Sequence, residues 1–135
     1  MSDEGLECVP IRDEADIVVA RQRGRTLAEH AGFRGTDSTI IATVISELAR
    51  NIVDYASRGE LCYGLEQGST SAIIIVARDS GPGIEDLATA MTDGYSTGGG
   101  LGLGLPGVRR LMDEFEIESS PGKGTVVWTR KVLRS

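Results

Sequence analysis

The sequence is poor in residues that bind transition metals or carry out histidine-based catalysis. It has one histidine, His30, and two cysteines, Cys8 and Cys62, which lie far apart without CxxC spacing. Such a pair favours buried free thiols over a disulfide or a zinc site. A Ser-His-Asp triad would have to use His30, which stands in a predicted helix between Glu29 and Ala31. We expect His30 to be a surface or half-buried residue instead.

Long hydrophobic runs and an excess of positive charge are also absent. The longest apolar run covers only Ala72 to Ala77, far short of the roughly 20 residues of a membrane span. The acidic start, Met1 to Gly5, lacks the charged and apolar regions of a signal peptide. With 14 lysines and arginines against 20 acidic residues, the net charge is −6, so no basic field would attract nucleic acid or an anionic membrane. These absences predict a cytoplasmic protein that binds neither nucleic acid nor membrane.

What remains is the composition of one soluble globular domain spanning residues 1–135. Of the 135 residues, 40% are hydrophobic and 25% are charged. No stretch resembles an interdomain linker, and no repeat has the period of a solenoid or propeller. Glycine is abundant, with 18 residues, and many of these are packed into the segment from Gly94 to Gly107.

The hydrophobic pattern predicts helices that alternate with hairpins. A first helix begins at Asp13 or Asp16 and ends at Gly32, and a second is capped by Thr36, Asp37 or Ser38 and ends near Gly59. Strands are predicted over residues 6–11, 61–66, 71–79, 115–119 and 125–132, with further helices over 84–91 and 106–115. Pro10 suits an edge strand, because it cannot donate to a ladder. The order favours an α/β two-layer sandwich, a mixed sheet covered on one face by helices.

Two polar residues share one shoulder of the second helix. Glu47 and Asn51 are i, i+4 neighbours at the edge of its apolar face. A carboxylate there can accept a proton, and an amide oxygen one turn later is a ligand type that suits Mg²⁺. The alternative is an ordinary polar shoulder on which Glu47 meets Arg50.

A turn follows the most apolar strand. Asp79-Ser-Gly-Pro-Gly83 holds the Asp79 carboxylate at a strand end, where it can accept a hydrogen bond from an exocyclic amine. Gly81 and Gly83 permit a sharp turn and the approach of a flat ligand. A plain turn of turn-forming residues is the alternative.

A glycine-rich segment precedes the helix at Pro106. Gly98-Gly-Gly-Leu-Gly-Leu-Gly104 can expose successive backbone N–H groups next to a helix N-terminus, an arrangement that binds polyphosphate. The leucines between the glycines argue against a solvated linker. The match to G-x-G-x-x-G lacks the preceding strand that a dinucleotide site requires. Gly122-Lys-Gly-Thr125 fails as a P-loop, because a strand follows it.

These segments together resemble a known superfamily. In order, Glu47–Asn51, Asp79–Gly83, Gly98–Gly104 and Gly122–Thr125 resemble the N, G1, G2 and G3 boxes of the GHKL ATPases (gyrase, Hsp90, histidine kinase and MutL), and the fold expected is their Bergerat-type ATP-binding fold. Within it, the run from Tyr95 to Phe115 is similar to the RsbT switch kinases of bacterial partner-switching systems.

The resemblance implies roles for particular residues. Glu47 would be the general base, and Asn51 would coordinate Mg²⁺. Asp79 would bind the adenine amino group, with Gly81, Gly83 and Thr125 completing the adenine pocket. The phosphates of ATP would meet the N–H groups of the glycine segment, namely those of Gly98, Gly100, Gly102 and Gly104.

The resemblance also implies an activity. Such kinases phosphorylate a serine or threonine on STAS-domain antagonist and scaffold proteins, and are then released to activate an output enzyme such as a PP2C-type phosphatase. Two alternatives stay open: an anti-sigma-factor serine kinase, and a nucleotide-sensing module without catalysis. Tyr55-Ala56 replaces the His-Ala pair of many sensor kinases, which argues against that branch. The positive charge at the γ-phosphate would come from Arg109, Arg110, Lys123 or the protein substrate.

Overall fold

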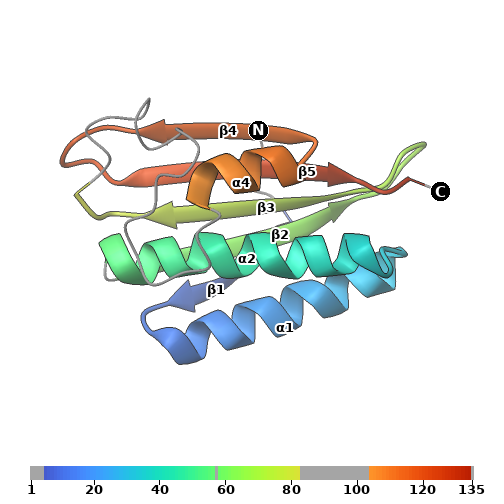
Figure 1. Ribbon diagram of the computed structural model, residues 1–135, viewed down its shortest axis with the longest axis horizontal. Coiled ribbons are helices and arrows are strands. Elements are labelled where there is room, and N and C mark those ends of the chain that lie inside the picture. Colours follow the sequence, from blue (N-terminus) through green and yellow to red (C-terminus); the bar gives the residue numbers. More distant parts are fainter. Residues whose placement is uncertain (1–4, 57, 83–103, 135) are drawn as a thin grey trace.

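The chain forms a five-stranded sheet with helices on one side (Figure 1). The computed structural model describes residues 5–56, 58–82 and 104–134. The strands, in the sheet order β1-β2-β3-β5-β4, are β1 (Glu7–Ile11), β2 (Gly59–Glu66), β3 (Ala72–Asp79), β4 (Glu114–Ser119) and β5 (Thr125–Val132). The described helices are α1 (Glu14–Ala31), α2 (Thr36–Tyr55) and α4 (Gly104–Leu111). The predicted two-layer α/β sandwich is confirmed.

The sheet is antiparallel, so the expectation of a mixed sheet is wrong. All pairings among the described strands are antiparallel. Strands β2 and β3 form a hairpin, as do β4 and β5, and a hairpin can only be antiparallel. Between β1 and β2 the chain reverses at the start of α1, between α1 and α2, and again into β2 (Figure 1). An odd number of reversals leaves β2 antiparallel to β1.

The predicted ends of α1 are confirmed. The Asp13 side chain caps the helix by accepting a hydrogen bond from the N–H of Asp16 at 3.2 Å. Gly32 ends it in the left-handed conformation, with φ 107°. Helix α2 has Gly35 as its N-cap, one residue before the first of the predicted caps. The helix ends at Tyr55 rather than near Gly59, and Gly59 is already the first residue of β2.

Pro10 lies in the edge strand β1, as predicted. Helix α4 starts at Gly104, and it ends at Leu111. Phe115, expected on the face of this helix, belongs to β4 instead, because Glu114 to Ser119 pair with β5. The helix predicted over 84–91 lies outside the described residues. None of the described helices is long and apolar enough to cross a membrane.

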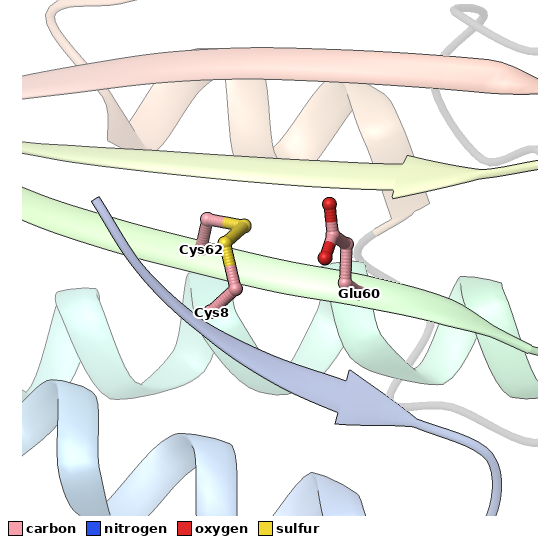
Figure 2. Close-up of side chains that lie close together, drawn as sticks. All are labelled: Cys8, Glu60 and Cys62. Carbon is pink, nitrogen blue, oxygen red and sulfur yellow. A yellow bond between two sulfur atoms is a disulfide. The ribbon is translucent and has the colours of Figure 1, made fainter. Parts of the chain in front are cut away.

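The two cysteines form a disulfide, which corrects the expectation of free thiols (Figure 2). Cys8 of β1 and Cys62 of β2 are direct cross-strand partners, and their Cα atoms lie 4.0 Å apart. The sequence separation of 54 residues contains two helices, and these return the chain to the β1 edge. Spacing along the sequence could not reveal this neighbourhood, because it arises from the pairing of distant strands.

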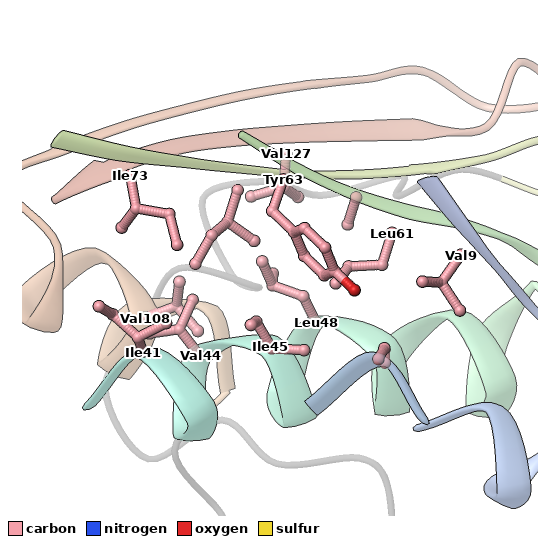
Figure 3. Packing of buried hydrophobic residues seen from close by; sticks show 14 of the residues in the cluster. Val9, Ile41, Val44, Ile45, Leu48, Leu61, Tyr63, Ile73, Val108 and Val127 are labelled. Atoms are coloured by element: carbon pink, nitrogen blue, oxygen red, sulfur yellow. The ribbon is translucent and has the colours of Figure 1, made fainter. Parts of the chain in front are cut away.

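The core lies between the sheet and the helices (Figure 3). Alternate residues of β3, including Ile73 and Ile75, face Ile41, Ile45 and Leu48 of α2. Each of these side chains is at most 1% exposed, and burying each contributes about 1.5 to 3 kcal/mol. The core therefore fixes α2 against the sheet and with it the positions of the polar residues on its shoulder.

Candidate active site

Three polar residues line up at one end of the sheet, on the helix-facing side. Asp79, the last residue of β3, lies opposite Thr125, the first residue of β5. Thr125 lies in turn opposite Ser119, the last residue of β4. The Ser119 and Thr125 hydroxyl oxygens are 2.7 Å apart, and Ser119 Oγ donates to the Gly124 carbonyl at 3.1 Å. The predicted neighbours Asp79 and Thr125 are thus brought together by strand register.

The β4–β5 turn packs directly on the segment that follows Asp79. The Gly122 N–H donates to the Pro82 carbonyl at 2.7 Å. Gly124 has φ +81°, and a Cβ there would collide with the carbonyl oxygen of Asp79. On the other side, a Cβ at Gly59 would lie 2.9 Å from Asp79 Cβ. Glycines on both sides therefore let backbone approach Asp79 closely.

Asp79 also shapes its own turn. Its Oδ1 accepts a hydrogen bond from the Gly81 N–H at 2.9 Å, an Asx-type turn that fixes the carboxylate at the strand end. A Cβ at Gly81 would lie 2.6 Å from Ala56 Cβ, so the turn packs against the residue that follows α2. Asp79 and the carboxyl-terminal part of α2 therefore belong to one end of the molecule.

Glu47 and Asn51 share one side of α2, as predicted. Glu47 is only 6% exposed, and Asn51 is half-buried. Arg50 makes its ion pair with Glu14 of α1, and the nearby charges of Asp54 and Glu47 also act on it. The hydrogen bond from Arg50 to Glu14 raises the pKa of Arg50. Glu47 therefore presents a buried carboxyl group one helical turn before the half-buried amide of Asn51.

The side of α2 that carries Glu47 also faces α4. Thr36, Ile40 and Thr43 of α2 line a groove with Gly107, Arg110 and Leu111 of α4. Glu47 follows Ile40 by seven residues, which is close to two full turns of an α-helix. Glu47 and Asn51 therefore continue the α4-facing stripe toward the end of the molecule that holds Asp79.

The glycine segment is described only at its last residue. Gly104 opens α4 with φ +58°, a conformation that favours glycine. Gly83, Gly98, Gly100 and Gly102 lie outside the described residues.

The three cations expected near the γ-phosphate, which are Arg109, Arg110 and Lys123, lie in two different parts of the fold. Arg109 and Arg110 belong to the last turn of α4, roughly 8 Å along its axis from Gly104. Lys123 is exposed in the β4–β5 turn, beside Gly122 and Gly124. The backbones of the two arginines therefore lie at the opposite end of α4 from Gly104.

Some neighbours of Asp79 were not predicted from the sequence. Ser119 reaches Thr125 only through the β4–β5 register, and Ala56 contacts Gly81 only because α2 ends beside the β3 turn. Gly59 had a signal, since a glycine at the start of a strand often marks close backbone approach. Nothing in the spacing could have revealed the contributions of Ser119 and Ala56.

Comparison with known proteins places the chain in a family. The family described as histidine kinase-, DNA gyrase B- and HSP90-like ATPase matches residues 36–134, and the chain belongs to this family. The serine/threonine-protein kinase RsbT of Bacillus subtilis (strain 168) is 50% identical over 137 residues, which cover 99% of this chain and 100% of RsbT. The anti-sigma F factor of Thermoanaerobacter sp. (strain X514) is 33% identical over 100 residues, covering 70% of each chain.

A solved structure shares the fold. The mycobacterial sensor histidine kinase MprB superposes with a TM-score of 0.55 at 16% identity, covering 93% of this chain and 96% of that one. The sequence relatives identify the chain as a nucleotide-using serine/threonine kinase of the RsbT type. Its relatives place it among the regulators of partner-switching systems.

Proposed function

We propose that this kinase uses ATP and Mg²⁺ to phosphorylate a serine or threonine of STAS-domain antagonist or scaffold proteins. It then binds and activates an output enzyme such as a PP2C-type phosphatase, and it acts in the cytoplasm as one kinase domain over residues 1–135. The observation that carries this proposal is the 50% identity to RsbT over 99% of the chain. The anti-sigma F factor covers only 70% of the chain at 33% identity, which favours the switch-kinase activity over an anti-sigma-factor kinase.

The strand end supplies the adenine pocket in this proposal. The Asp79 carboxylate accepts the hydrogen bond of the adenine amino group, and Thr125 offers a hydroxyl beside it. Gly81 and Gly83 shape the pocket. Support comes from the register that places Asp79 next to Thr125 and from the glycines that leave room around Asp79.

The phosphates bind at the amino-terminal end of α4. Gly98, Gly100, Gly102 and Gly104 donate backbone N–H groups, and the helix end adds a partial positive charge. This arrangement binds polyphosphate without many basic side chains, in agreement with the net charge of −6. The position of Gly104 at the start of α4 supports it.

Glu47 and Asn51 divide the chemistry. The Asn51 amide oxygen is a ligand for Mg²⁺, and its half-buried place beside a buried carboxylate fits a hard cation that prefers oxygen. When bound, Mg²⁺ neutralises charge on the phosphates. Glu47 takes the proton of the substrate hydroxyl as that oxygen bonds to the γ-phosphorus and the bond to ADP breaks. A module that only senses nucleotide has no need for such a base.

The test is transfer of labelled phosphate from ATP to a panel of STAS-domain proteins, with Mg²⁺ present. The proposal expects label on a serine or threonine of at least one of them, and loss of that label with the Glu47→Gln variant. Label on no STAS protein would contradict the substrate assignment. Equal labelling by Glu47→Gln would contradict the role of Glu47 as base.

A further inference from the structure

The face of the sheet that the helices leave uncovered carries a cluster of reactive groups. The Cys8–Cys62 disulfide lies there, close to Glu60 (Figure 2). Cys62 packs against Ile74 and Val76 rather than in the helix-facing core. The Arg78 guanidinium lies over it, with Nη2 3.3 Å from Cys62 Sγ and 3.9 Å from Cys8 Sγ. Arg78 Nε also donates to Glu60 at 3.0 Å.

The two sulfurs differ in their access to solvent. Cys8 belongs to the edge strand β1 and is exposed, whereas Cys62 is fully buried. Cys8 is therefore the more accessible of the two cysteines to a small thiol. The sulfur that would leave in such an attack is Cys62, which lies nearest to the Arg78 guanidinium. A neighbouring cation stabilises a thiolate and makes it a better leaving group.

We propose that Cys8 and Cys62 form a reversible thiol–disulfide switch that exchanges with low-molecular-weight thiols through Cys8. In a reducing compartment, a disulfide within a folded protein is usually one that senses redox conditions. The proposal rests on the cytoplasmic location proposed above, but not on the kinase activity.

The exchange balances with a small thiol as the reductant. A small thiolate attacks Cys8 Sγ, the bond between the two cysteines breaks, and Cys62 leaves as a thiolate beside Arg78. A second small thiolate attacks the mixed disulfide on its small-molecule sulfur, so that Cys8 is released and a small-molecule disulfide forms. The pair of cysteines gains two electrons and, with two protons from solvent, becomes two thiols, while two small thiols are oxidised. Oxidation runs through the same steps in reverse.

Arg78 and Glu60 act as positioning residues for this exchange. The guanidinium stabilises the departing Cys62 thiolate, and Glu60 competes for the same guanidinium through its ion pair with Arg78. Removing the charge of Arg78 should therefore slow exchange, and removing the charge of Glu60 should speed it. These opposite effects distinguish an electrostatic role from a general loosening of the sheet.

A metal site is the competing use of the cluster, because Cys8, Glu60 and Cys62 offer ligand atoms within 4.8 Å of one another. The Arg78 guanidinium contacts all three of these groups. A resident cation opposes the binding of a second one. The arrangement therefore favours thiol chemistry over a zinc ion.

The switch acts on the edge of the sheet. In the oxidised form, β1 is tied to β2 by a covalent bond as well as by the ladder from Glu7 to Ile11. In the reduced form the ladder alone holds it. We expect the amides of β1 to exchange with solvent faster after reduction, while those of β3 and β5 keep their protection.

In the experiment, the full chain is equilibrated with mixtures of glutathione and glutathione disulfide. Free thiols are then trapped by alkylation, and mass spectrometry of the intact protein gives the oxidised fraction. We expect the oxidised fraction to change reversibly across the series. Reduction of Arg78→Gln by excess glutathione should be roughly tenfold slower than in the parent, with the rate restored in Arg78→Lys and raised in Glu60→Gln. The matched control is Arg25→Gln, which removes an arginine from an exposed ion pair with Glu29 on α1.

Several results would overturn the proposal. The first is a Cys8–Cys62 pair that stays fully oxidised or fully reduced in every glutathione mixture. The second is an Arg78→Gln variant that is reduced at the same rate as Arg25→Gln. Protection of the reduced thiols from alkylation by one equivalent of Zn²⁺ would assign the cluster to a metal instead. Should Arg78→Gln fail to fold by circular dichroism, an unchanged rate in Glu60→Gln would be the contradicting result.

Discussion

The Tyr63 hydroxyl is buried in the core, and no hydrogen-bond partner for it is present among the described residues (Figure 3). Burial raises the pKa of Tyr63 to about 12, from an ordinary value near 10. A raised pKa means that the folded state holds the proton more tightly than the unfolded state. The stability linked to Tyr63 is therefore fully present below pH 10 and is lost as the pH rises from about 10 to 12.

A Tyr63→Phe variant tests both the cost of the buried hydroxyl and the pH dependence of stability. Removing an unpaired buried hydroxyl should raise the free energy of unfolding at pH 7 by about 1 kcal/mol, and the loss of stability between pH 10 and 12 should become shallower. Urea unfolding at several pH values measures both effects. A less stable Tyr63→Phe variant at pH 7 would show that the hydroxyl has a partner after all.

Glu47 and Asn51 should separate by experiment. Glu47→Gln keeps the shape of a side chain that is only 6% exposed, so ATP binding should persist while phosphotransfer falls by roughly 100-fold or more. Asn51→Ala should instead lose the part of ATP binding that depends on Mg²⁺. Calorimetry with and without Mg²⁺, paired with a phosphotransfer assay, distinguishes the two variants. Identical defects in both would contradict the division of roles.

At the scale of the elements, the β4–β5 turn supports Asp79, and a matched pair of glycines tests it. Gly122 and Gly124 both have positive φ, of 78° and 81°, but only Gly124 would place a Cβ against the carbonyl oxygen of Asp79. Both substitutions to alanine should cost about 1 to 3 kcal/mol from backbone strain. Gly124→Ala should in addition weaken ATP binding, whereas Gly122→Ala should not. Equal affinities in the two variants would contradict the support that the turn gives to Asp79.

The elements themselves could largely be predicted from sequence. The 3.6-residue period of α2 and the alternation in β3 and β5 reflect burial on one side, which local sequence records directly. The direction of β1 relative to β2 could not be predicted, because it depends on how many reversals the two helices between them introduce. The N-cap of α2 was also not predicted. Gly35 has no side chain that would mark it as a cap, and the Ser38 and Thr39 hydroxyls donate to its carbonyl.

At the candidate site, too, contacts set by local sequence could be predicted and contacts set by tertiary structure could not. Glu47 and Asn51 share a helix, so their proximity follows from sequence spacing alone. Asp79 and Thr125 were paired only through the resemblance, because their contact depends on the β3–β5 register. Ser119 and Ala56 were missed for the same reason: their contacts depend on tertiary structure, which no local pattern encodes.

At the scale of the whole molecule, the disulfide closes a loop of 54 residues that contains both long helices. Reduction should therefore lower the free energy of unfolding by about 2 to 4 kcal/mol. Urea titrations with and without dithiothreitol measure the change, and a Cys8→Ser, Cys62→Ser double variant should not respond to the reductant. An unchanged midpoint in the parent protein would show that the covalent link does not form in solution.

The ATP affinity of an Asp79→Asn variant tests the strand-end adenine site most directly. An amide in place of the acceptor carboxylate presents a donor to the adenine amine, at a cost of about 1 to 3 kcal/mol. Calorimetry should therefore show ATP binding roughly 5- to 150-fold weaker than in the parent, while a variant with Asp54→Asn, which changes an exposed aspartate of α2, should bind like the parent. An Asp79→Asn variant that binds ATP with the parent affinity would contradict the account.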